Sequence, residues 1–341
     1  MYDIITFGSA ARDIFLKSEG FKIRQEKKFF NGKGLFISLG SKIPVKELHF
    51  FTGGGGTNTA FTFSNQSFKV AYCGMVGDDF AGKEIAKELK ENKISTDLVF
   101  IDKKHHTNYS IVLLTKDERT ILVFKGASEN LRVKNIPWKK LKTRWFYLAP
   151  LSGKLFNIFE PLLNFAKKKK IKIALNPGNT QLSLPKEKLK KILNFANVLI
   201  LNQEEASLAT GFLYHKEKEI FQTLDKWVEG IVVMTKGPFG AVVSDGKWLY
   251  RVGILKLKKI VDRTGAGDAF GSGFVAGLIR ATGNKQPATS KNIEFAIQLA
   301  SANATSCLQK MGAKNGLLKK KENIFKFGKV KIEKQPLQIT N

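Results

Sequence analysis

The sequence predicts an α/β fold in which a doubly wound, mainly parallel sheet is flanked by helices. Three observations lead to this prediction. Short apolar runs recur along the chain, as expected of strands that are buried on both faces. Lysine-rich segments of helical length separate these runs. Polar or glycine-rich residues follow several runs directly, and α/β proteins bind ligands beyond the carboxyl ends of their strands.

The expected strands are the apolar runs, and the expected helices are the stretches with apolar residues at helical spacing. The strands are residues 4–8, 70–76, 146–148, 171–175, 198–201, 231–234, 242–244 and 248–252. The helices are residues 80–92, 155–170, 186–195, 268–279 and 292–309, with another beginning near residue 57. Strands that alternate with helices imply parallel neighbours in the sheet.

A chain of 341 residues is long enough to bury a large core. Residues 19–51 and 107–124 alternate weakly between apolar and polar side chains, so they predict short strands and turns rather than helices. Neither an internal repeat nor a linker divides the sequence. We therefore expect residues 1–341 to form a single domain, with the lysine-rich end from residue 319 onward at its periphery.

The composition indicates a folded protein of a reducing compartment. Apolar residues make up 43% of the chain. The two cysteines, Cys73 and Cys307, lie far apart in apolar runs and lack the spacing of metal ligands, so we expect buried thiols and no zinc site. No basic start precedes the short apolar run at residues 4–7, and no run approaches the ~18 residues of a membrane span. We therefore expect a cytoplasmic protein without a membrane partner.

The formal net charge of +28 is compatible with nucleic-acid binding. The excess is mostly lysine in short runs such as residues 167–170, whereas arginine, which nucleic-acid-binding proteins favour for bidentate contacts, is scarce. We therefore expect solvated lysine faces and no specific nucleic-acid partner. A basic nucleic-acid-binding protein stays the alternative, and its affinity would fall steeply with salt.

The stretch at residues 261–277 carries the strongest chemical signal. Gly265, Ala266 and Gly267 form a sharp turn directly before a helix, where unpaired amides and the helix dipole favour an anion. Asp268 follows in the first helical turn. A carboxylate beside a phosphate site can take the proton from a hydroxyl that attacks phosphorus. The alternative is that Asp268 only caps the helix.

Two further motifs lie beside expected strand ends or helix starts. Asp13 follows the first expected strand, where a carboxylate can accept hydrogen bonds from two vicinal hydroxyls, although a surface turn is the alternative. The run of four glycines at residues 53–56 leads directly into a helix, so backbone can approach a ligand there. Gly53, Gly54 and Asn58 are the candidate contacts in this motif.

Two later strand ends also carry polar motifs. Asn202 and Glu205 are three residues apart, which fits a capping box as well as a ligand site. Thr235, Gly237 and Gly240 end another strand in a glycine-bearing loop. Both motifs are expected at the same edge of the sheet.

Together these motifs resemble the ribokinase-like (PfkB) carbohydrate kinases, over roughly residues 4–316. The match to the family's second signature, roughly D-T-x-G-A-G-D, consists of Asp262, Thr264, Gly265, Ala266, Gly267 and Asp268. The four-glycine run with Asn58 is similar to the first signature. The pair Asn202 and Glu205 is similar to the family's N-x-x-E element, and the loop at residues 235–240 to its T-x-G-x-x-G nucleotide loop.

The resemblance implies a fold, an activity and a role for each motif. It implies a ribokinase-like fold with a small β-sheet lid from segments at about residues 14–51 and 105–125. The implied acceptor ligands are Asp13, Gly53, Gly54 and Asn58, and the implied ATP ligands are Asn202, Thr235, Gly237, Gly240 and Gly267. Asp268 would be the base, with Gly265, Ala266 and Gly267 as the anion hole. Glu205 would hold Mg²⁺ through water, and Asp262 and Thr264 are compatible with a monovalent cation such as K⁺.

The implied activity is transfer of the γ-phosphoryl group of ATP to a hydroxyl of a small sugar. An adenosine-type nucleoside kinase and a non-catalytic sugar-sensing protein are the alternatives. Ribokinases place an acidic residue that faces the substrate after the strand near Leu148, where this chain has Ala149, Pro150 and Leu151, so strict ribose specificity does not follow. The aromatic residues Phe29, Phe30, Phe36 and Tyr109 are candidates to stack on a nucleobase or to form lid core. A homodimer through the lid is a further expectation.

Overall fold

The apolar runs of the sequence form one central sheet in the computed structural model, which describes residues 1–29, 32–115, 118–283 and 288–337. The strands are β1 (Tyr2–Phe7), β6 (Val70–Gly77), β7 (Ile94–Ser95), β8 (Val99–Asp102), β11 (Thr143–Leu148), β12 (Lys172–Leu175), β13 (Val198–Asn202), β14 (Ile231–Thr235), β15 (Ala241–Ser244), β16 (Trp248–Val252) and β17 (Ile332–Pro336). Their order is β17-β16-β15-β14-β13-β12-β11-β1-β6-β7, with β8 paired to β6 beside this path. Neighbours from β7 to β14 are parallel, and β15 to β17 are antiparallel.

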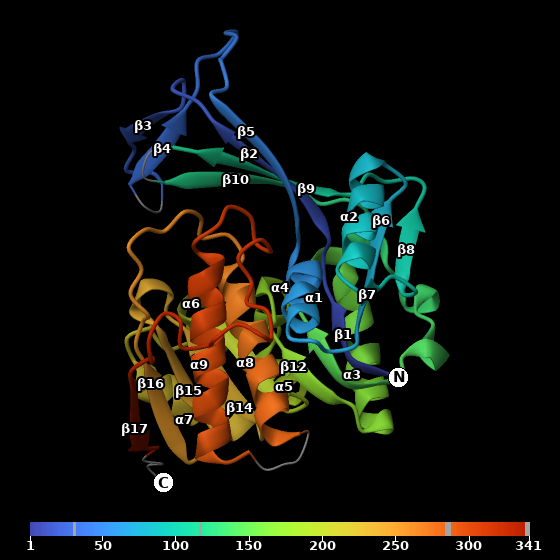
Figure 1. The fold of residues 1–341 in the computed structure, drawn as a ribbon, viewed down its shortest axis with the longest axis vertical. Coiled ribbons are helices and arrows are strands. Elements are labelled where there is room, and N and C mark those ends of the chain that lie inside the picture. The colour runs from blue at the N-terminus through green and yellow to red at the C-terminus, as the bar shows by residue number, and fades with distance from the viewer. Residues whose placement is uncertain (30–31, 116–117, 284–287, 338–341) are drawn as a thin grey trace.

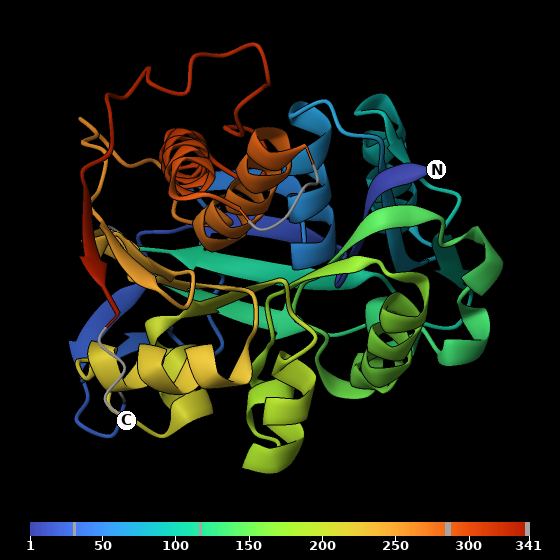
Figure 2. The ribbon, with the colours of Figure 1, turned by 90° about the horizontal axis from the view of Figure 1, so that it is seen from below.

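Helices cover both faces of this sheet (Figure 1, Figure 2). They are α1 (Gly55–Asn65), α2 (Phe80–Glu91), α3 (Phe159–Lys169), α4 (Asn179–Leu182), α5 (Lys186–Leu193), α6 (Gln203–Thr210), α7 (Glu217–Trp227), α8 (Ala266–Thr282) and α9 (Ser290–Cys307). Adjacent strand residues point to opposite faces, so Ile4 joins the core under α1, α8 and α9, whereas Ile5 joins the core under α3 and α5 to α7. The predicted fold class is therefore confirmed.

One expectation about the chain end was wrong. Residues from 319 onward are not all peripheral, because β17 pairs with β16 and extends the central sheet by an edge strand. Val330 and Leu337, on either side of β17, are buried. The strand itself reads Ile-Glu-Lys-Gln-Pro and is mostly exposed, so it lacks the apolar alternation that marks a strand in sequence.

A second, smaller sheet stands over one end of the central sheet, and we call it the lid sheet (Figure 1). Its strands, in the order β10-β9-β2-β5, are β10 (Arg119–Phe124), β9 (Asn108–Leu114), β2 (Ala11–Lys17) and β5 (Glu47–Gly53). A separate hairpin pairs β3 (Lys22–Gln25) with β4 (Lys33–Phe36). The expectations for residues 30–31 and 116–117 of the lid segments, and for residues 284–287 and 338–341 of the domain, lie outside the described residues.

The connectivity of the central sheet reverses beside β1. From β1 the chain passes through the lid strands β2 and β5 to β6 on one side, whereas β11 lies on the other side and is followed outward by β12 to β14. Such a point opens a crevice at the carboxyl ends of the strands, where α/β folds bind ligands. Gly8 directly follows β1, and Ala149 directly follows β11. The Ala149 amide donates to the Phe7 carbonyl over 2.9 Å. Among the described residues, no helix is long and apolar enough to cross a membrane.

Candidate active site

Asp268 lies in the first turn of α8. Gly265 caps this helix with a left-handed backbone, φ 76°, and a Cβ there would collide with Ala313. Asn58 from α1 donates from Nδ2 to Asp268 Oδ2 over 2.9 Å. Burial raises the pKa of the Asp268 carboxyl, and the hydrogen bond from Asn58 partly offsets this rise. A partly buried carboxylate with a raised pKa has the properties of a general base.

The turn before Asp268 leaves room for a ligand. A Cβ built on Gly267 meets no atom of the described residues within 4 Å, so this side of the turn is open. The first amides of α8, those of Ala266, Gly267 and Asp268, have no partner within the helix and lie at the positive end of its dipole. The Ala266 amide donates over a long 3.4 Å to the Arg263 carbonyl. Gly265, Ala266 and Gly267 thus form a turn at the amino end of α8, and the anion-binding role predicted for them from the sequence stays a prediction.

Asp13 lies in the lid strand β2 and not in the loop after β1. It is 5% exposed, and the side chain of Ser110 on β9 hydrogen-bonds to it. Burial raises the pKa of Asp13 to about 6; the Ser110 bond and the charge of Lys314 act against this rise. A Cβ on Gly53 would overlap the Asp13 carboxylate, so a larger residue there would displace the carboxylate or the end of β5.

The glycine-rich run connects the two carboxylates. Gly54 has φ 96°, and a Cβ there would strike the Ser9 carbonyl. The next residue, Gly55, lies close to the base, since a Cβ there would be 3.7 Å from Asp268 Oδ1 and 3.2 Å from the Ala149 Cβ. Asp13 and Asp268 thus stand at the two ends of one short backbone segment. Asn58 Oδ1 near Asp268 is buried without a hydrogen-bond partner among the described residues.

Asn202 and Glu205 form the capping box of α6. Asn202 Oδ1 accepts from the Glu205 amide and Glu205 Oε2 accepts from the Asn202 amide, both over 2.8 Å. The structural interpretation of this motif is therefore correct, and it does not exclude a ligand. Burial, together with the charges of Glu204 and Asp268, raises the pKa of Glu205. Glu205 is thus close enough to Asp268, the candidate base, for an electrostatic interaction.

The loop after β14 stands beside Asn202, because Thr235 pairs with Asn202 in register. Gly237 has φ 54° and open space around a built Cβ, and Gly240 has φ 85°. The adjacent Lys236 does not extend freely into this loop, since its Nζ lies 2.9 Å from Glu217 Oε2 on α7. The structure therefore brings the three predicted loop residues to the sheet edge that carries Asn202.

Asp262 stabilises the turn before α8 by hydrogen bonds. Its Oδ1 accepts from the amide and the hydroxyl of Thr264 over 2.9 and 2.8 Å, and its Oδ2 accepts from the Gly312 amide over 2.9 Å. Arg119 of the lid approaches the same carboxylate, with 3.8 Å between Nη1 and Oδ1. These contacts give Asp262 and Thr264 a structural role whether or not a cation binds there.

Sequence reasoning missed two residues beside Asp13. Ser110 sits opposite Asp13 in the parallel pair of β2 and β9, a register that only the lid sheet creates. Lys314 follows α9 and is 6% exposed, although nothing near it in the sequence marks it among so many lysines. Its only local signal in the sequence is that it directly follows Gly312 and Ala313.

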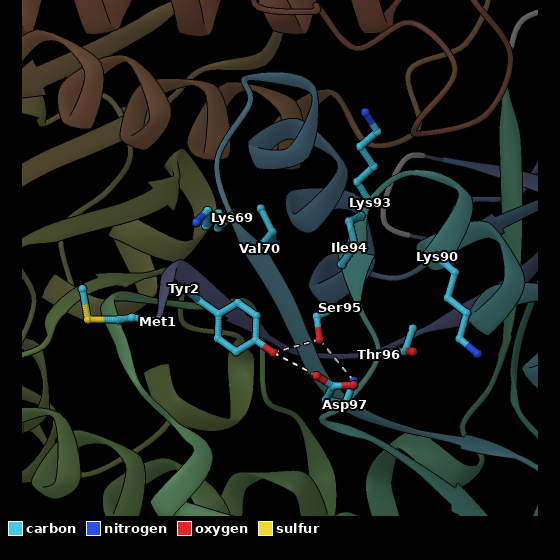
Figure 3. Close-up of a pocket in the computed structure, with 10 residues that line it drawn as sticks. All are labelled: Met1, Tyr2, Lys69, Val70, Lys90, Lys93, Ile94, Ser95, Thr96 and Asp97. Atoms are coloured by element: carbon cyan, nitrogen blue, oxygen red, sulfur yellow. Dashed lines mark hydrogen bonds between the residues drawn. The ribbon is translucent and has the colours of Figure 1, made fainter.

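A hollow at the opposite end of the sheet is separate from this site (Figure 3). Tyr2, Val70 and Ile94 line it, and they stand at the amino ends of β1, β6 and β7. Its floor is held together by a 2.8 Å hydrogen bond between the side chains of Tyr2 and Ser95. Ligands of α/β folds bind at the other end of the strands, so this hollow is not the candidate active site.

Comparisons with known proteins show the family of this chain. The profile of the pfkB family carbohydrate kinases matches residues 2–320. A ribokinase of Lactococcus lactis is 27% identical over 86% of this chain and 92% of its own length. A nucleoside kinase of Methanocaldococcus jannaschii is 23% identical over 72% of this chain and 78% of its own length.

Solved structures show the same fold. Arabidopsis thaliana ribokinase, complexed with ribose and ATP, superposes with a TM-score of 0.76 and 22% identity, over 96% of this chain and 98% of its own. The structure of the M. jannaschii nucleoside kinase superposes with a TM-score of 0.71 and 21% identity, over 93% of this chain and 95% of its own.

Proposed function

Because this chain belongs to the pfkB family of carbohydrate kinases, we propose that it transfers the γ-phosphoryl group of ATP to a hydroxyl of a small sugar. The observation that carries the proposal is the pair of carboxylates at the two ends of the glycine-rich run. Asp13 is placed to hold acceptor hydroxyls, and Asp268 is held by Asn58 beside an anion-binding turn. An alcohol between them can meet a phosphoryl group at the start of α8.

In this mechanism Asp268 takes the proton from the acceptor hydroxyl as its oxygen attacks the γ-phosphorus. The new oxygen–phosphorus bond forms while the bond to the leaving ADP oxygen breaks. The amides of Gly265, Ala266 and Gly267 stabilise the negative charge on the transferring group. The acceptor is held on the other side by Asp13, Gly53, Gly54 and Asn58. Asn58 Oδ1, which has no partner among the described residues, can accept from one of its hydroxyls.

The nucleotide is proposed to lie along the ends of β13 and β14. Asn202, Thr235, Gly237 and Gly240 are gathered there, and Gly267 faces the phosphates from α8. The open space at Gly237 and Gly267 allows phosphate oxygens to approach the backbone.

Mg²⁺ is proposed to be held by the nucleotide phosphates and, through water, by Glu205. No group of three or more His, Cys, Asp or Glu side chains in the described part of the chain could hold a metal ion, and Mg²⁺ typically keeps several waters and binds through one or two carboxylates. The mutual repulsion of Glu205 and Asp268 fits a cation between them. When bound, the ion would neutralise charge on the phosphates.

A monovalent cation near Asp262 and Thr264 is a separate proposal. Asp262 already accepts three hydrogen bonds, so a cation would share the carboxylate with these donors. Replacing KCl by tetramethylammonium chloride at constant ionic strength would test it, because loss of turnover without K⁺ supports the site and unchanged turnover contradicts it.

A nucleoside acceptor is the second candidate, and the lid sheet supplies the observation that favours it. Asp13, Ser110 and Val123 lie opposite one another on one face of the lid sheet, and Val123 is 63% exposed. An exposed apolar side chain beside the carboxylate proposed to bind a diol can pack against a flat base. Tyr109, the neighbour of Ser110, is in strand β9 and points to the other face, so the aromatic residues are not all available for stacking.

A homodimer through the lid is also proposed. The face of the lid sheet opposite Asp13 includes Phe50 and Leu122, which are 50% and 52% exposed. A second copy would cover such apolar side chains. Light scattering of the wild type and of Leu122→Lys tests this, because a wild type that is monomeric at all concentrations contradicts it. The cytoplasmic location stays a prediction from sequence.

The decisive experiment measures ADP release with a panel of sugars and nucleosides, each with a blank that lacks the acceptor. Stimulation by a sugar supports the first candidate, and stimulation by nucleosides alone supports the second. Acceptor binding by calorimetry without ADP release would instead favour the sugar-sensing alternative. Salt-sensitive binding to nucleic acid with no ADP release would favour the basic binding protein.

A further inference from the structure

A buried lysine stands beside the acceptor side of the site. Lys314 lies in the segment after α9, and only 6% of its surface is exposed. Its Nζ donates to Thr52 Oγ1 on β5 over 2.7 Å and to Glu88 Oε2 on α2 over 3.2 Å. The same ammonium group stands 4.4 Å from the ring centre of Phe61 on α1. Burying an ammonium group costs free energy unless the group is paired, so the burial of Lys314 indicates a specific role.

The contacts of Lys314 join the body of the protein to the lid sheet. Thr52 precedes Gly53, whose backbone packs under the Asp13 carboxylate, and Glu88 accepts from the Thr52 hydroxyl as well as from Lys314. Thus the ammonium group holds the carboxyl end of β5 in place, and the proposed acceptor-binding residues Gly53 and Gly54 directly follow Thr52.

The charges around Asp13 act on its pKa in opposite directions, and Lys314 has the largest single effect among them. Asp262 and Asp268 raise its pKa by repelling its ionised form, whereas Lys314 lowers it by attraction. The interaction is mutual: burial lowers the pKa of Lys314, and Glu88 and Asp13 raise it again. Without the lysine, Asp13 would face two like charges, and of the groups that lower its pKa the Ser110 hydroxyl would remain.

We propose that Lys314 is a positioning residue for the acceptor: it anchors the end of β5 and supplies the positive charge that the Asp13 carboxylate requires for binding hydroxyls. The kinetic part of this proposal rests on the proposed function. The electrostatic part does not, because it concerns Asp13 in the free protein.

The electrostatic part is tested by NMR of protein labelled with ¹³C at the aspartate carboxyls, with the Asp13 signal assigned from Asp13→Asn. In Lys314→Met, which keeps most of the side-chain length and removes the charge, the Asp13 pKa should rise by about one pH unit, the lower end of the effect of a nearby opposite charge. The exposed Lys310→Met in the same segment is the matched control and should leave this pKa unchanged. An unchanged Asp13 pKa in Lys314→Met overturns the proposal.

Two further variants separate charge from packing. Glu88→Gln removes a partner of Lys314 but keeps the cation, so the Asp13 pKa should not rise. The double variant Lys314→Met with Glu88→Gln removes the whole ion pair, which leaves no orphaned charge if Lys314→Met alone fails to fold. The double variant should show the same rise as Lys314→Met, and equal Asp13 pKa values in the double variant and the wild type overturn the proposal.

The kinetic arm uses whichever acceptor stimulates ADP release in the wild type. Lys314→Met should raise the KM for that acceptor by roughly fivefold at pH 6, where a one-unit rise in the pKa of Asp13 leaves about a tenth of it ionised instead of about half, and hardly at all at pH 9, with the KM for ATP unchanged. An equal loss at both pH values overturns the charge role. A wild type that phosphorylates no acceptor contradicts the proposed function instead, and the Asp13 titration still decides the role of Lys314.

Discussion

The two carboxylates of the candidate site are both shielded from water but are held in opposite ways. Asp13 on the lid sheet accepts from Ser110, faces the buried cation Lys314, and has a pKa of about 6. Asp268 on the body is held by one amide donor from Asn58, and no cation among the described residues shifts its pKa. On the side of Asp13, which we call the acceptor side, the cation Lys314 stabilises the carboxylate. On the side of Asp268, which we call the phosphoryl side, a neutral amide group stabilises the carboxylate.

This difference suits two different tasks. A group that only holds hydroxyls works best if it stays ionised throughout the reaction, and a nearby fixed cation favours that state. A group that takes a proton works best if its ionised state is not strongly stabilised, so a neutral hydrogen-bond donor without a nearby cation is suitable. The comparison thus predicts that changes on the phosphoryl side reduce kcat, and that changes on the acceptor side reduce acceptor binding.

The largest effect is expected at Asp268. Asp268→Asn should lower kcat by a factor of about 10² or more, because the amide cannot take the proton, and this factor corresponds to about 2.7 kcal/mol of barrier. Binding of ATP and of the acceptor, measured by calorimetry, should remain near the wild-type value. Turnover within a few-fold of wild type would remove Asp268 from the mechanism and with it the contrast between the two sides.

The second effect is expected at Gly53 and should appear in the KM for the acceptor. Gly53→Ala places a methyl group where the Asp13 carboxylate lies, so either the carboxylate or the strand end must move. We expect the acceptor KM to rise about tenfold while the KM for ATP changes little, in line with the rate cost of small misplacements in a site. Gly253→Ala is the matched control, because its Cβ would meet Lys331 at an ordinary 3.5 Å. Equal losses in both variants would show a general fold effect.

The third effect is a pH dependence that belongs to the acceptor side. Since Asp13 has a pKa of about 6 in the free protein, it gains a proton as the pH falls through that value and then accepts from hydroxyls more weakly and at fewer sites than the carboxylate does. The acceptor KM should therefore rise several-fold between pH 7 and pH 5. Asp13→Asn should have a high acceptor KM that varies little over this range. An acceptor KM that is flat in the wild type would separate Asp13 from acceptor binding.

The sequence was sufficient for features that are local. Strands end in recognisable turns, so the residues that flank Gly53, Thr235 and Asp268 are enough to place these segments at one edge of the sheet. The same holds for the capping box of Asn202 and Glu205, because its two hydrogen bonds span only three residues.

Features that depend on distant residues could not be predicted. Asp13 lies near the beginning of the chain and Lys314 near its end. Their proximity depends on the register of the lid strands and on the course of the backbone after α9. The edge strand β17 was missed for a related reason: its polar residues gain their strand structure from pairing with β16, not from an apolar pattern.

The smallest effect is expected at Lys236, on the nucleotide side. Lys236 stands in the glycine-bearing loop, but its ammonium group pairs with Glu217, which also accepts from Arg251 Nε over 2.9 Å. Removing Lys236 therefore leaves Glu217 with a cationic partner, and pairs near the surface contribute only about 0–1 kcal/mol. Lys236→Met should change the KM for ATP by less than about threefold. A larger increase would show that the Lys236 ammonium group leaves Glu217 and contacts the phosphates when ATP binds. ATP binding, like acceptor binding, would then depend on a cation of the protein.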